Sequence, residues 1–317
     1  MPNTETVRAF APATVGNIIC GFDVFGLALG EPGDEVEARL WNEPGVVISA
    51  VHGDGGRLPT EAARNVAGVA TAAVLAESRM EDVGVEIEVW KGLPISGGMG
   101  GSAASAVAAV VAADALLQTG LSPEALLRCA SEGERGPKGD THPDNIAPAL
   151  HGGIVMVRPE EPEIVIPLPV PTGLAVALVH PDLEFETSEM RGILPDVLPL
   201  KQAVRQWGDC AALVVGLYEE DWDLITRALV DRVAEPHRSP FIPGFDAVRA
   251  AGLEAGALGA GLSGSGPSMF ALCRSVSEAE SVATAMAGAF AEVGLEGVDT
   301  HVSEVGDTGA HVIEAPA

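Results

Sequence analysis

Apolar and polar residues alternate in several stretches of the N-terminal part of the chain, and this period of two predicts β-strands. The clearest stretch places Val85, Ile87 and Val89 on one side of an extended chain and the residues between them on the other. The strands predicted in this part of the chain are residues 7–15, 34–40, 46–51 and 83–94.

Capping residues and runs of helix-forming residues predict three helices in the same part. Thr60, with a glutamate directly behind it, is the expected cap of a helix over residues 60–79. A second helix, built of small residues, is expected from Ser102 to Leu117. A third is expected to begin at Ser122, which is followed by a proline and a glutamate.

The proline-rich residues 168–173 predict a domain boundary near residue 170, so we expect one domain over residues 1–170 and another over 171–317. Strands and helices are mixed in both parts, which indicates an α+β protein. The further strands expected are 152–157, 163–169, 173–181 and 298–305, and the further helices are 187–195, 199–218, 220–233 and 277–293, followed by a polar tail.

The amino-acid composition indicates a globular protein of the cytoplasm. Hydrophobic residues make up 47% of the 317 residues, enough for a sizeable core, yet no apolar run has the length of a membrane span. The first residues lack the basic and apolar regions of a signal peptide. The cysteines are far apart and show no spacing typical of a metal site, so we expect free thiols in the cytoplasm. They are Cys20, Cys129, Cys210 and Cys273.

The charge is strongly one-sided, with 18 basic and 45 acidic residues and a net charge of −27. This excludes the basic surface that nucleic-acid binding needs. The acids are spread along the chain, which favours adaptation to high salt over binding of one basic partner.

Four glycines crowd into residues 94–107, PISGGMGGSAASAV, between an expected strand and an expected helix. Such a loop aims backbone N–H groups at one point next to the positive end of the helix dipole, and this arrangement binds phosphate without lysine. Ser102 adds a hydroxyl for a magnesium ion or a phosphate oxygen. The alternative is a plain tight turn, for which four glycines are more than required. The Walker pattern is absent, and the dinucleotide spacing does not fit.

The same stretch resembles the P-x-x-x-G-L-G-S-S-A-A motif of the GHMP kinases, with Met99 in place of the leucine and Gly101 in place of the first serine. The resemblance implies that this loop binds ATP. Lys91, just before the loop, is a further candidate for a phosphate contact, although a lysine at the end of a strand usually faces solvent. The ATP-binding candidates are Lys91, Pro94, Gly98, Met99, Gly100, Gly101, Ser102, Ala103 and Ser105.

A second glycine-rich stretch, residues 259–272, resembles the C-terminal motif of the same family. Taken alone, it is equally well explained as a strand–turn–strand packing element. With the first loop on the same chain, a shared site is the better interpretation. Its candidate residues are Gly261, Ser263, Gly264, Ser265 and Gly266.

Four further segments narrow the resemblance to the homoserine kinases of this superfamily: residues 11–29, 132–153, 186–195 and 235–245. One departure is Ile19, which stands where the homoserine kinase pattern has a glycine. Arginine binds carboxylates with a two-pronged fork, whereas an ammonium group requires acids and amide oxygens. The resemblance therefore implies a substrate pocket formed by Asn17, Asp23, His142, Asp144, Arg191 and Arg238.

The resemblance also implies a mechanism. Asn145 stands where related kinases have an aspartate, and an amide can orient a hydroxyl but cannot accept its proton. Asn145, Arg191 and Thr187 form the expected catalytic set, and Ser102 and Glu134 are the candidate Mg²⁺ ligands.

The expected fold is an N-terminal domain like ribosomal protein S5 domain 2 and a ferredoxin-like C-terminal domain, in a homodimer. The expected reaction is the phosphorylation of L-homoserine by ATP for threonine synthesis. Two alternatives remain: a GHMP kinase for another alcohol, such as shikimate or mevalonate, and a non-catalytic binding protein on the same fold. Retention of Ser102, Glu134 and Asn145 argues against the second alternative.

Overall fold

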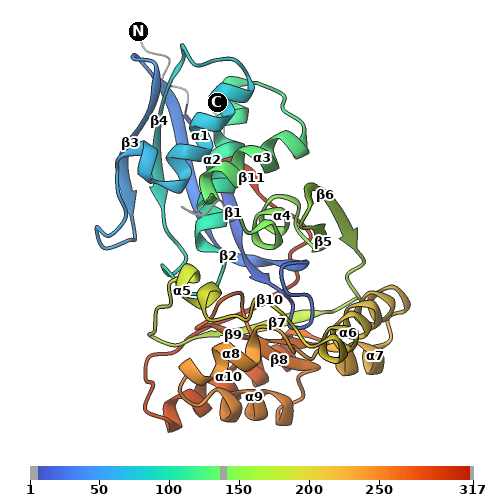
Figure 1. The fold of residues 1–317 in the computed structure, drawn as a ribbon. Coiled ribbons are helices and arrows are strands. Elements are labelled where there is room, and N and C mark those ends of the chain that lie inside the picture. The colour runs from blue at the N-terminus through green and yellow to red at the C-terminus, as the bar shows by residue number, and fades with distance from the viewer. Residues whose placement is uncertain (1–5, 136–140, 315–317) are drawn as a thin grey trace.

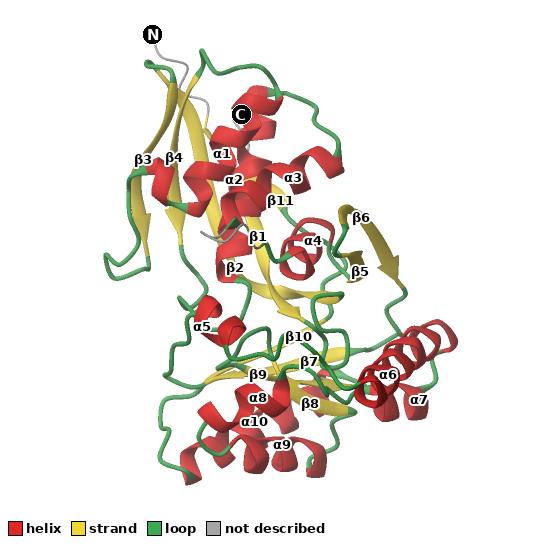
Figure 2. Cartoon of the chain, in the orientation of Figure 1, coloured by secondary structure: helices red, strands yellow, loops and turns green. Residues whose placement is uncertain are grey.

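The computed structural model describes residues 6–135 and 141–314 of the chain. Two β-sheets lie one above the other in Figures 1 and 2, each with helices packed against it. The mixture of sheets and helices confirms the predicted α+β class. Among the described residues, no helix is both long enough and apolar enough to span a lipid bilayer.

The first sheet has seven strands in the order β11-β1-β2-β4-β3, and β5 and β6 extend it from one end of β2. Neighbouring strands are antiparallel except for β3 and β4. Its strands are β1 (Thr6–Gly16), β2 (Phe25–Trp41), β3 (Gly45–His52), β4 (Gly84–Trp90), β5 (Ile154–Arg158), β6 (Glu161–Leu168) and β11 (His311–Glu314).

Helix α2 is the central helix of this half and packs against β1, β2, α1 and α3. Its residues from Ala103 to Val110 are all buried, because alanine, serine and valine allow neighbours to approach closely on every side. This packing fixes the start of α2, which faces the second half. The helices here are α1 (Val66–Glu77), α2 (Gly101–Leu117), α3 (Pro123–Glu134), α4 (Pro143–His151) and the short 3₁₀ helix η1 (Ala62–Arg64).

The second sheet has the order β10-β7-β9-β8, and every neighbouring pair is antiparallel. In chain order its strands and helices follow the βαββαβ pattern with strand order 4-1-3-2, as expected for a ferredoxin-like unit. The strands are β7 (Ala175–His180), β8 (Gly259–Leu262), β9 (Met269–Cys273) and β10 (Asp299–Glu304). The helices are α5 (Thr187–Gly192), α6 (Leu200–Glu219), α7 (Trp222–Ala228), α8 (Glu235–Arg238), η2 (Ser239–Phe241), α9 (Phe245–Glu254) and α10 (Val276–Glu292).

Some predicted boundaries were wrong. Helix α1 begins at Val66 rather than near Thr60, because the Asn65 side chain accepts a hydrogen bond from Ala67 N and caps the helix there. Helix α7 ends at Ala228 instead of continuing to residue 233. The cap predicted at Ser122 is confirmed, since its side chain accepts from Ala125 N.

The start of β2, before the predicted strand 34–40, was missed, and so were several whole elements, among them α4, α9 and β11. Strand β2 begins at Phe25, and its first five residues are all buried, so they show no alternation that sequence could reveal. Helix α4 lies in the segment 132–153, of which residues 136–140 fall outside the described chain. The expected polar tail contains β11, which pairs with β1. Apart from β11, the first sheet precedes residue 170 and the second follows it; the division of the domains there stays a prediction.

Candidate active site

A cleft of about 720 Å³ lies between the two halves, with α5 beside it (Figure 1). Every substrate-binding, catalytic and metal-binding candidate from the sequence lines this cleft, although they come from both ends of the chain. They are Asn17, Asp23, Ser102, Glu134, His142, Asp144, Asn145, Thr187, Arg191 and Arg238.

The first glycine loop requires glycine at two positions. Gly98 and Gly100 have φ angles of +76° and +67°, a backbone region that side chains disfavour. A Cβ on Gly98 would lie 2.6 Å from Ser263 O, and one on Gly100 would overlap the Thr14 hydroxyl. Gly100 is also the cap of α2 and offers no side chain to the first N–H groups of the helix. The start of α2 therefore lies at the cleft with no side-chain cap on its first N–H groups, an arrangement that is suited to an anion.

The two glycine loops are bound to each other. Ser263 Oγ donates to Gly98 O and Ser268 Oγ donates to Gly97 O, both at 2.6 Å. Asn17 Nδ2 donates to Gly264 O at 3.1 Å, so the N-terminal motif joins the same point. These hydrogen bonds bring the two glycine loops and the N-terminal motif together, which supports a shared site.

Not every residue of the second motif faces the cleft. Gly261 lies within β8, where a Cβ would meet the Glu235 carboxylate at 2.7 Å. Ser263 is fully buried, and Gly264 and Ser265 are the residues of this motif that line the cleft.

Lys91 is held inside the protein. Its ammonium group donates to Asp34, to Gly101 O at 2.8 Å and to Ser105 Oγ at 2.9 Å, and its side chain is 4% exposed. An ammonium group has three protons, so these partners use all of them. This arrangement favours a structural role for Lys91 and Ser105. Met99 and Ala103 are buried beneath the loop and do not line the cleft.

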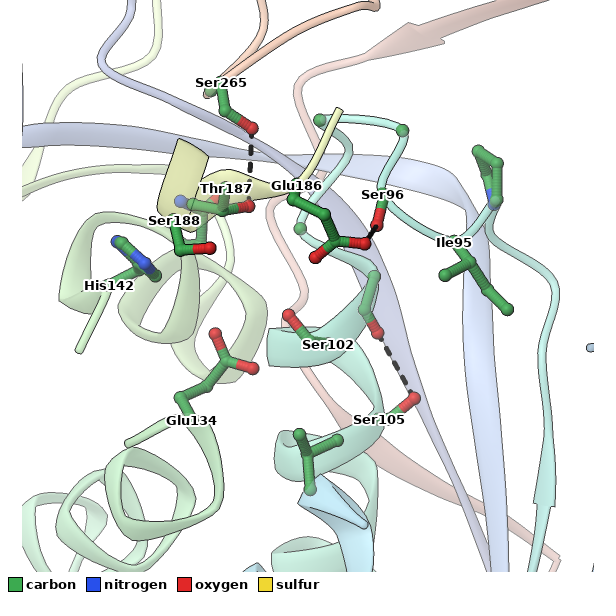
Figure 3. A pocket seen from close by; sticks show the side chains of 18 of the residues that line it. Ile95, Ser96, Ser102, Ser105, Glu134, His142, Glu186, Thr187, Ser188 and Ser265 are labelled. Atoms are coloured by element: carbon green, nitrogen blue, oxygen red, sulfur yellow. Dashed lines mark hydrogen bonds between the residues drawn. The ribbon is translucent and has the colours of Figure 1, made fainter. Parts of the chain in front are cut away.

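Ser102 and Glu134 point toward one another across the cleft (Figure 3). Burial raises the pKa of the Glu134 carboxyl, and a hydrogen bond from Ser102 and the charge of Lys91 oppose that rise. A carboxylate and a hydroxyl are hard oxygen donors of the kind that Mg²⁺ prefers. Among the described residues there is no group of three His, Cys, Asp or Glu side chains suited to a metal, so an ion here would need oxygens from a ligand.

Arg191 and Asp23 form a two-pronged ion pair at one end of the cleft. Nη1 and Nη2 of Arg191 donate to the two carboxylate oxygens of Asp23 at 2.5 and 2.9 Å, and Nη2 lies 3.4 Å from His142 Nδ1. Arg191 is one helical turn after Thr187 on α5, so both side chains face the same way. Thr187 Oγ1 lies 3.4 Å from Ser265 Oγ.

Arg238 is buried at the cleft, with 3% of its surface exposed. Its Nε donates to Met190 O and its Nη1 to Gly264 O, both at 3.1 Å, and it forms no ion pair with any residue in the described ranges. The Phe22 ring lies 5.3 Å from the Arg191 guanidinium carbon and 5.6 Å from that of Arg238. Burial, and next the positive charge of Arg191, lower the pKa of Arg238. A buried cation facing a cleft favours an anionic ligand.

The start of α4 contributes two neighbours. Asp144 is 3% exposed, and burial, reinforced by the negative charge of Asp23, raises its pKa to about 7. Asn145 Oδ1 accepts a hydrogen bond from Thr14 Oγ1 at 2.9 Å, which fixes the orientation of its amide. The sequence motifs include both residues but did not point to Thr14 as a partner of Asn145, because the two lie 131 positions apart in the chain.

Comparison with known proteins identifies the family of this chain. Profiles of the N-terminal and C-terminal GHMP kinase domains match residues 65–153 and 213–292. A homoserine kinase of Chlorobium phaeobacteroides (strain DSM 266) is 46% identical over 98% of this chain and 100% of its own length. One of Chloroherpeton thalassium is 47% identical over 91% of this chain and 93% of its own. This chain belongs to the homoserine kinase family.

Solved structures extend the comparison. The crystal structure of a homoserine kinase from Cytophaga hutchinsonii has a TM-score of 0.93 and 45% identity, covering 97% of each chain. Mevalonate kinase of L. major, in complex with R-mevalonate, has a TM-score of 0.70 over 96% of this chain but only 16% identity, so the likeness is one of fold. The family assignment confirms the two-domain GHMP kinase fold.

One end of the cleft was missed by the homoserine kinase motifs. Leu58 and Pro59 come from the connection between β3 and α1, and Val66 is the first residue of α1. Val89 of β4 and Ile95 of the glycine loop also line the cleft. No sequence motif marks them, because scattered apolar residues are common in any core. Next to Ile95, Ser96 Oγ donates to Glu186 at 3.2 Å (Figure 3).

The departure of Ile19 from the homoserine kinase pattern has a structural consequence. Asn17, Ile18 and Ile19 all have positive φ angles, of 73°, 39° and 60°. A β-branched residue in this region is strained, and the family's glycine would not be. Ile19 is 2% exposed, so burial of its side chain offsets that strain.

Proposed function

We propose that this chain transfers the γ-phosphate of ATP to the side-chain hydroxyl of L-homoserine, forming O-phospho-L-homoserine for threonine synthesis in the cytoplasm. The observation that carries the proposal is the pairing of opposite charges in one cleft: Arg238 for a carboxylate, and Asp23 with Asp144 for an ammonium group. An amino acid carries both groups. The homoserine kinase relatives support the same choice.

The cleft accommodates ATP along its length. The apolar end formed by Leu58, Pro59 and Val66 suits a purine base, and the glycine loop at the start of α2 suits the phosphates. The γ-phosphate would then lie near Ser102, between the base and the amino-acid end. Arg191, either released from Asp23 or still paired with it, would add positive charge beside the phosphate that is transferred.

Ser102 and Glu134 would hold Mg²⁺ together with phosphate oxygens, and their oxygen donors fit that ion. When bound, the ion would neutralise charge on the phosphates during transfer.

The reaction would be accelerated by the positioning of the homoserine hydroxyl and not by a side chain that acts as a base. Asn145 is held by Thr14 and would orient the homoserine hydroxyl toward the γ-phosphate, with Thr187 beside it. Neither side chain takes up a proton at neutral pH, so the phosphate itself would receive the proton of the attacking hydroxyl.

The decisive experiment measures ADP release with L-homoserine, shikimate or mevalonate as acceptor, in buffer with ample salt. Of these three acceptors, we expect only L-homoserine to be phosphorylated. Arg238→Ala should raise KM for homoserine by roughly 100-fold, because truncating one side of a buried charged pair costs about 2–5 kcal/mol. Arg191→Ala should likewise raise KM. Arg274→Ala, on an exposed turn away from the cleft, is the matched control.

Phosphorylation of shikimate or mevalonate would show that the substrate is another alcohol. Shikimate tests the ammonium pocket in particular, because it has a carboxylate but no ammonium group. Binding of ATP and homoserine by calorimetry without turnover would indicate the binding-protein alternative. An unchanged KM in Arg238→Ala would remove that arginine from the pocket.

A further inference from the structure

Helix α6, at the edge of the second half in Figure 1, carries a row of polar side chains on one side. Gln202, Gln206, Asp209 and Cys210 follow one another at steps of four, three and one residues, which keeps them on the same side of a helix. Each forms a hydrogen bond with one of two segments that carry residues of the substrate pocket. These four residues do not line the cleft themselves, so any effect they have on a substrate passes through those segments.

The first segment is the turn between β1 and β2, which holds Asn17 and Asp23. The Cys20 carbonyl lies within this turn and accepts hydrogen bonds from Gln206 Nε2 and, at 3.0 Å, from the Cys210 thiol. In the described chain no backbone N–H donates to this buried carbonyl, so α6 supplies the partners that it needs. Asn17 and Asp23 have positive φ angles of 73° and 57°, and such backbone persists only where its surroundings hold it.

The second segment runs from Asp231 through α8 to Arg238. Gln206 Oε1 accepts a hydrogen bond from Arg232 N at 2.9 Å. The adjacent Asp231 carboxylate accepts from the backbone N–H groups of residues 233–235, at distances between 2.6 and 3.0 Å, and so caps the start of α8. The position of α8, and with it that of Arg238 at its end, therefore depends on where α6 holds this segment.

One amide thus joins the two sides of the pocket. An amide both donates and accepts, which neither an ionised carboxylate nor an apolar side chain can do. Gln206 is 6% exposed, so its loss would leave Arg232 N without this partner and the Cys20 carbonyl with the weaker thiol donor. An α-amino acid has its two charged groups on one carbon, so Asp23 and Arg238 must lie at a matching separation to bind both.

We propose that Gln206 is a positioning residue for the amino-acid substrate: its amide sets the separation of the segments that carry Asp23 and Arg238. This inference rests on the proposed function, because L-homoserine is the ligand whose two charges those residues would bind. The nucleotide end of the cleft lies at the start of α2, to which Gln206 forms no hydrogen bond. Binding of ATP should therefore be nearly independent of Gln206.

Steady-state kinetics of Gln206→Met test the proposal. Methionine is similar in length to glutamine but lacks the amide, so the variant loses both hydrogen bonds. We expect KM for L-homoserine to rise at least roughly tenfold, because a misplacement of about 1 Å can cost about 100-fold. We expect KM for ATP to stay within about threefold of the wild type. Leu213→Ala, which removes packing from the buried face of the same helix, is the matched control for a loss of stability alone.

The outcomes separate this inference from the proposed function. If the wild type phosphorylates L-homoserine, three results would overturn the inference alone: an unchanged KM for homoserine in Gln206→Met, equal rises of both KM values, or the same rise in Leu213→Ala. A wild type that does not phosphorylate L-homoserine would overturn the proposed function, and this inference with it. If Gln206→Met does not fold, Gln206→Glu replaces it, because an ionised carboxylate still accepts from Arg232 N but cannot donate to Cys20 O. Its KM for homoserine should rise in the same way.

A double-mutant cycle tests whether Gln206 acts through the charged pair. The separation of Asp23 and Arg238 matters only while both charges are present. In an Arg238→Ala background, Gln206→Met should therefore lower kcat/KM for homoserine by less than about threefold, against at least roughly tenfold in the wild-type background. Equal losses in the two backgrounds would show that Gln206 acts independently of Arg238 and would contradict the proposal.

Discussion

At the scale of single residues, the cleft combines groups whose charges are perturbed by burial. Asp144 stands out, because its carboxyl is 3% exposed and its pKa is raised to about 7 from the usual 3.8. A folded-state pKa above the unfolded value means that the folded protein holds the proton more tightly. Asp144 therefore costs no stability below about pH 4, and it costs progressively more as the pH rises to about 7.

We expect Asp144→Asn to flatten the fall in stability between pH 5 and pH 7. A single group releases up to about 1.4 kcal/mol per pH unit in this window. Guanidinium denaturation of wild type and variant at both pH values measures the difference, in which all other groups cancel. Glu235, whose pKa burial also raises to about 7, gives an independent check through Glu235→Gln. Parallel stability profiles for Asp144→Asn and wild type would show that Asp144 is ionised throughout.

At the scale of elements, the sequence predicts what is local and misses what depends on register. The glycine loop, the Ser122 cap and the β4 alternation depend on residues close together, and all are found. The partner of Lys91 is Asp34, 57 positions earlier, and only the antiparallel pairing of β2 with β4 brings them together. The sequence does not reveal the register between β2 and β4, so it gave no sign that Asp34 binds Lys91. Lys91 was therefore a candidate for a phosphate contact.

The Lys91–Asp34 pair yields a prediction at this scale, because it joins β2, the residue directly after β4 and the first turn of α2. Lys91→Met leaves a fully buried carboxylate without its cation and should lower the free energy of unfolding by about 3–5 kcal/mol. The double variant Lys91→Met with Asp34→Leu should recover most of this loss, since apolar replacement of a buried pair is often neutral.

ATP kinetics of the double variant separate the two roles of Lys91. A structural lysine predicts a KM for ATP within about threefold of the wild type, a difference under 1 kcal/mol. A lysine that contacts phosphate predicts a KM for ATP that stays high after stability is restored. Thermal unfolding of the same preparations confirms that stability has recovered.

At the scale of the whole molecule, the two halves are joined by hydrogen bonds at the cleft itself. Ser263, Ser268 and Asn17 bind the glycine loops together, so the site forms only when both halves are in place. Helix α6 reaches the same region from outside, since the Cys210 thiol donates to Cys20 O at 3.0 Å, within the turn that carries Asn17 and Asp23.

The net charge of −27 acts on the stability of the folded chain as a whole. Self-repulsion should destabilise the folded chain in dilute buffer, and salt should relieve it, because the Debye length falls from about 10 Å at 0.1 M to about 3 Å at 1 M. We expect the unfolding temperature to rise by several degrees over this range and then level off. A non-ionic osmolyte stabilises by exclusion and should show no such plateau.

A variant separates charge screening from general salt effects. Changing Glu280, Glu292 and Glu296, three exposed acids near the end of the chain, to glutamine lowers the net charge to −24 without touching the cleft. If repulsion sets the stability, this variant should melt higher than wild type in low salt and at nearly the same temperature at about 1 M, where charges are screened. An equal difference at both salt concentrations would instead assign the effect to local helix propensity, and the acidic composition would then have no role in salt adaptation.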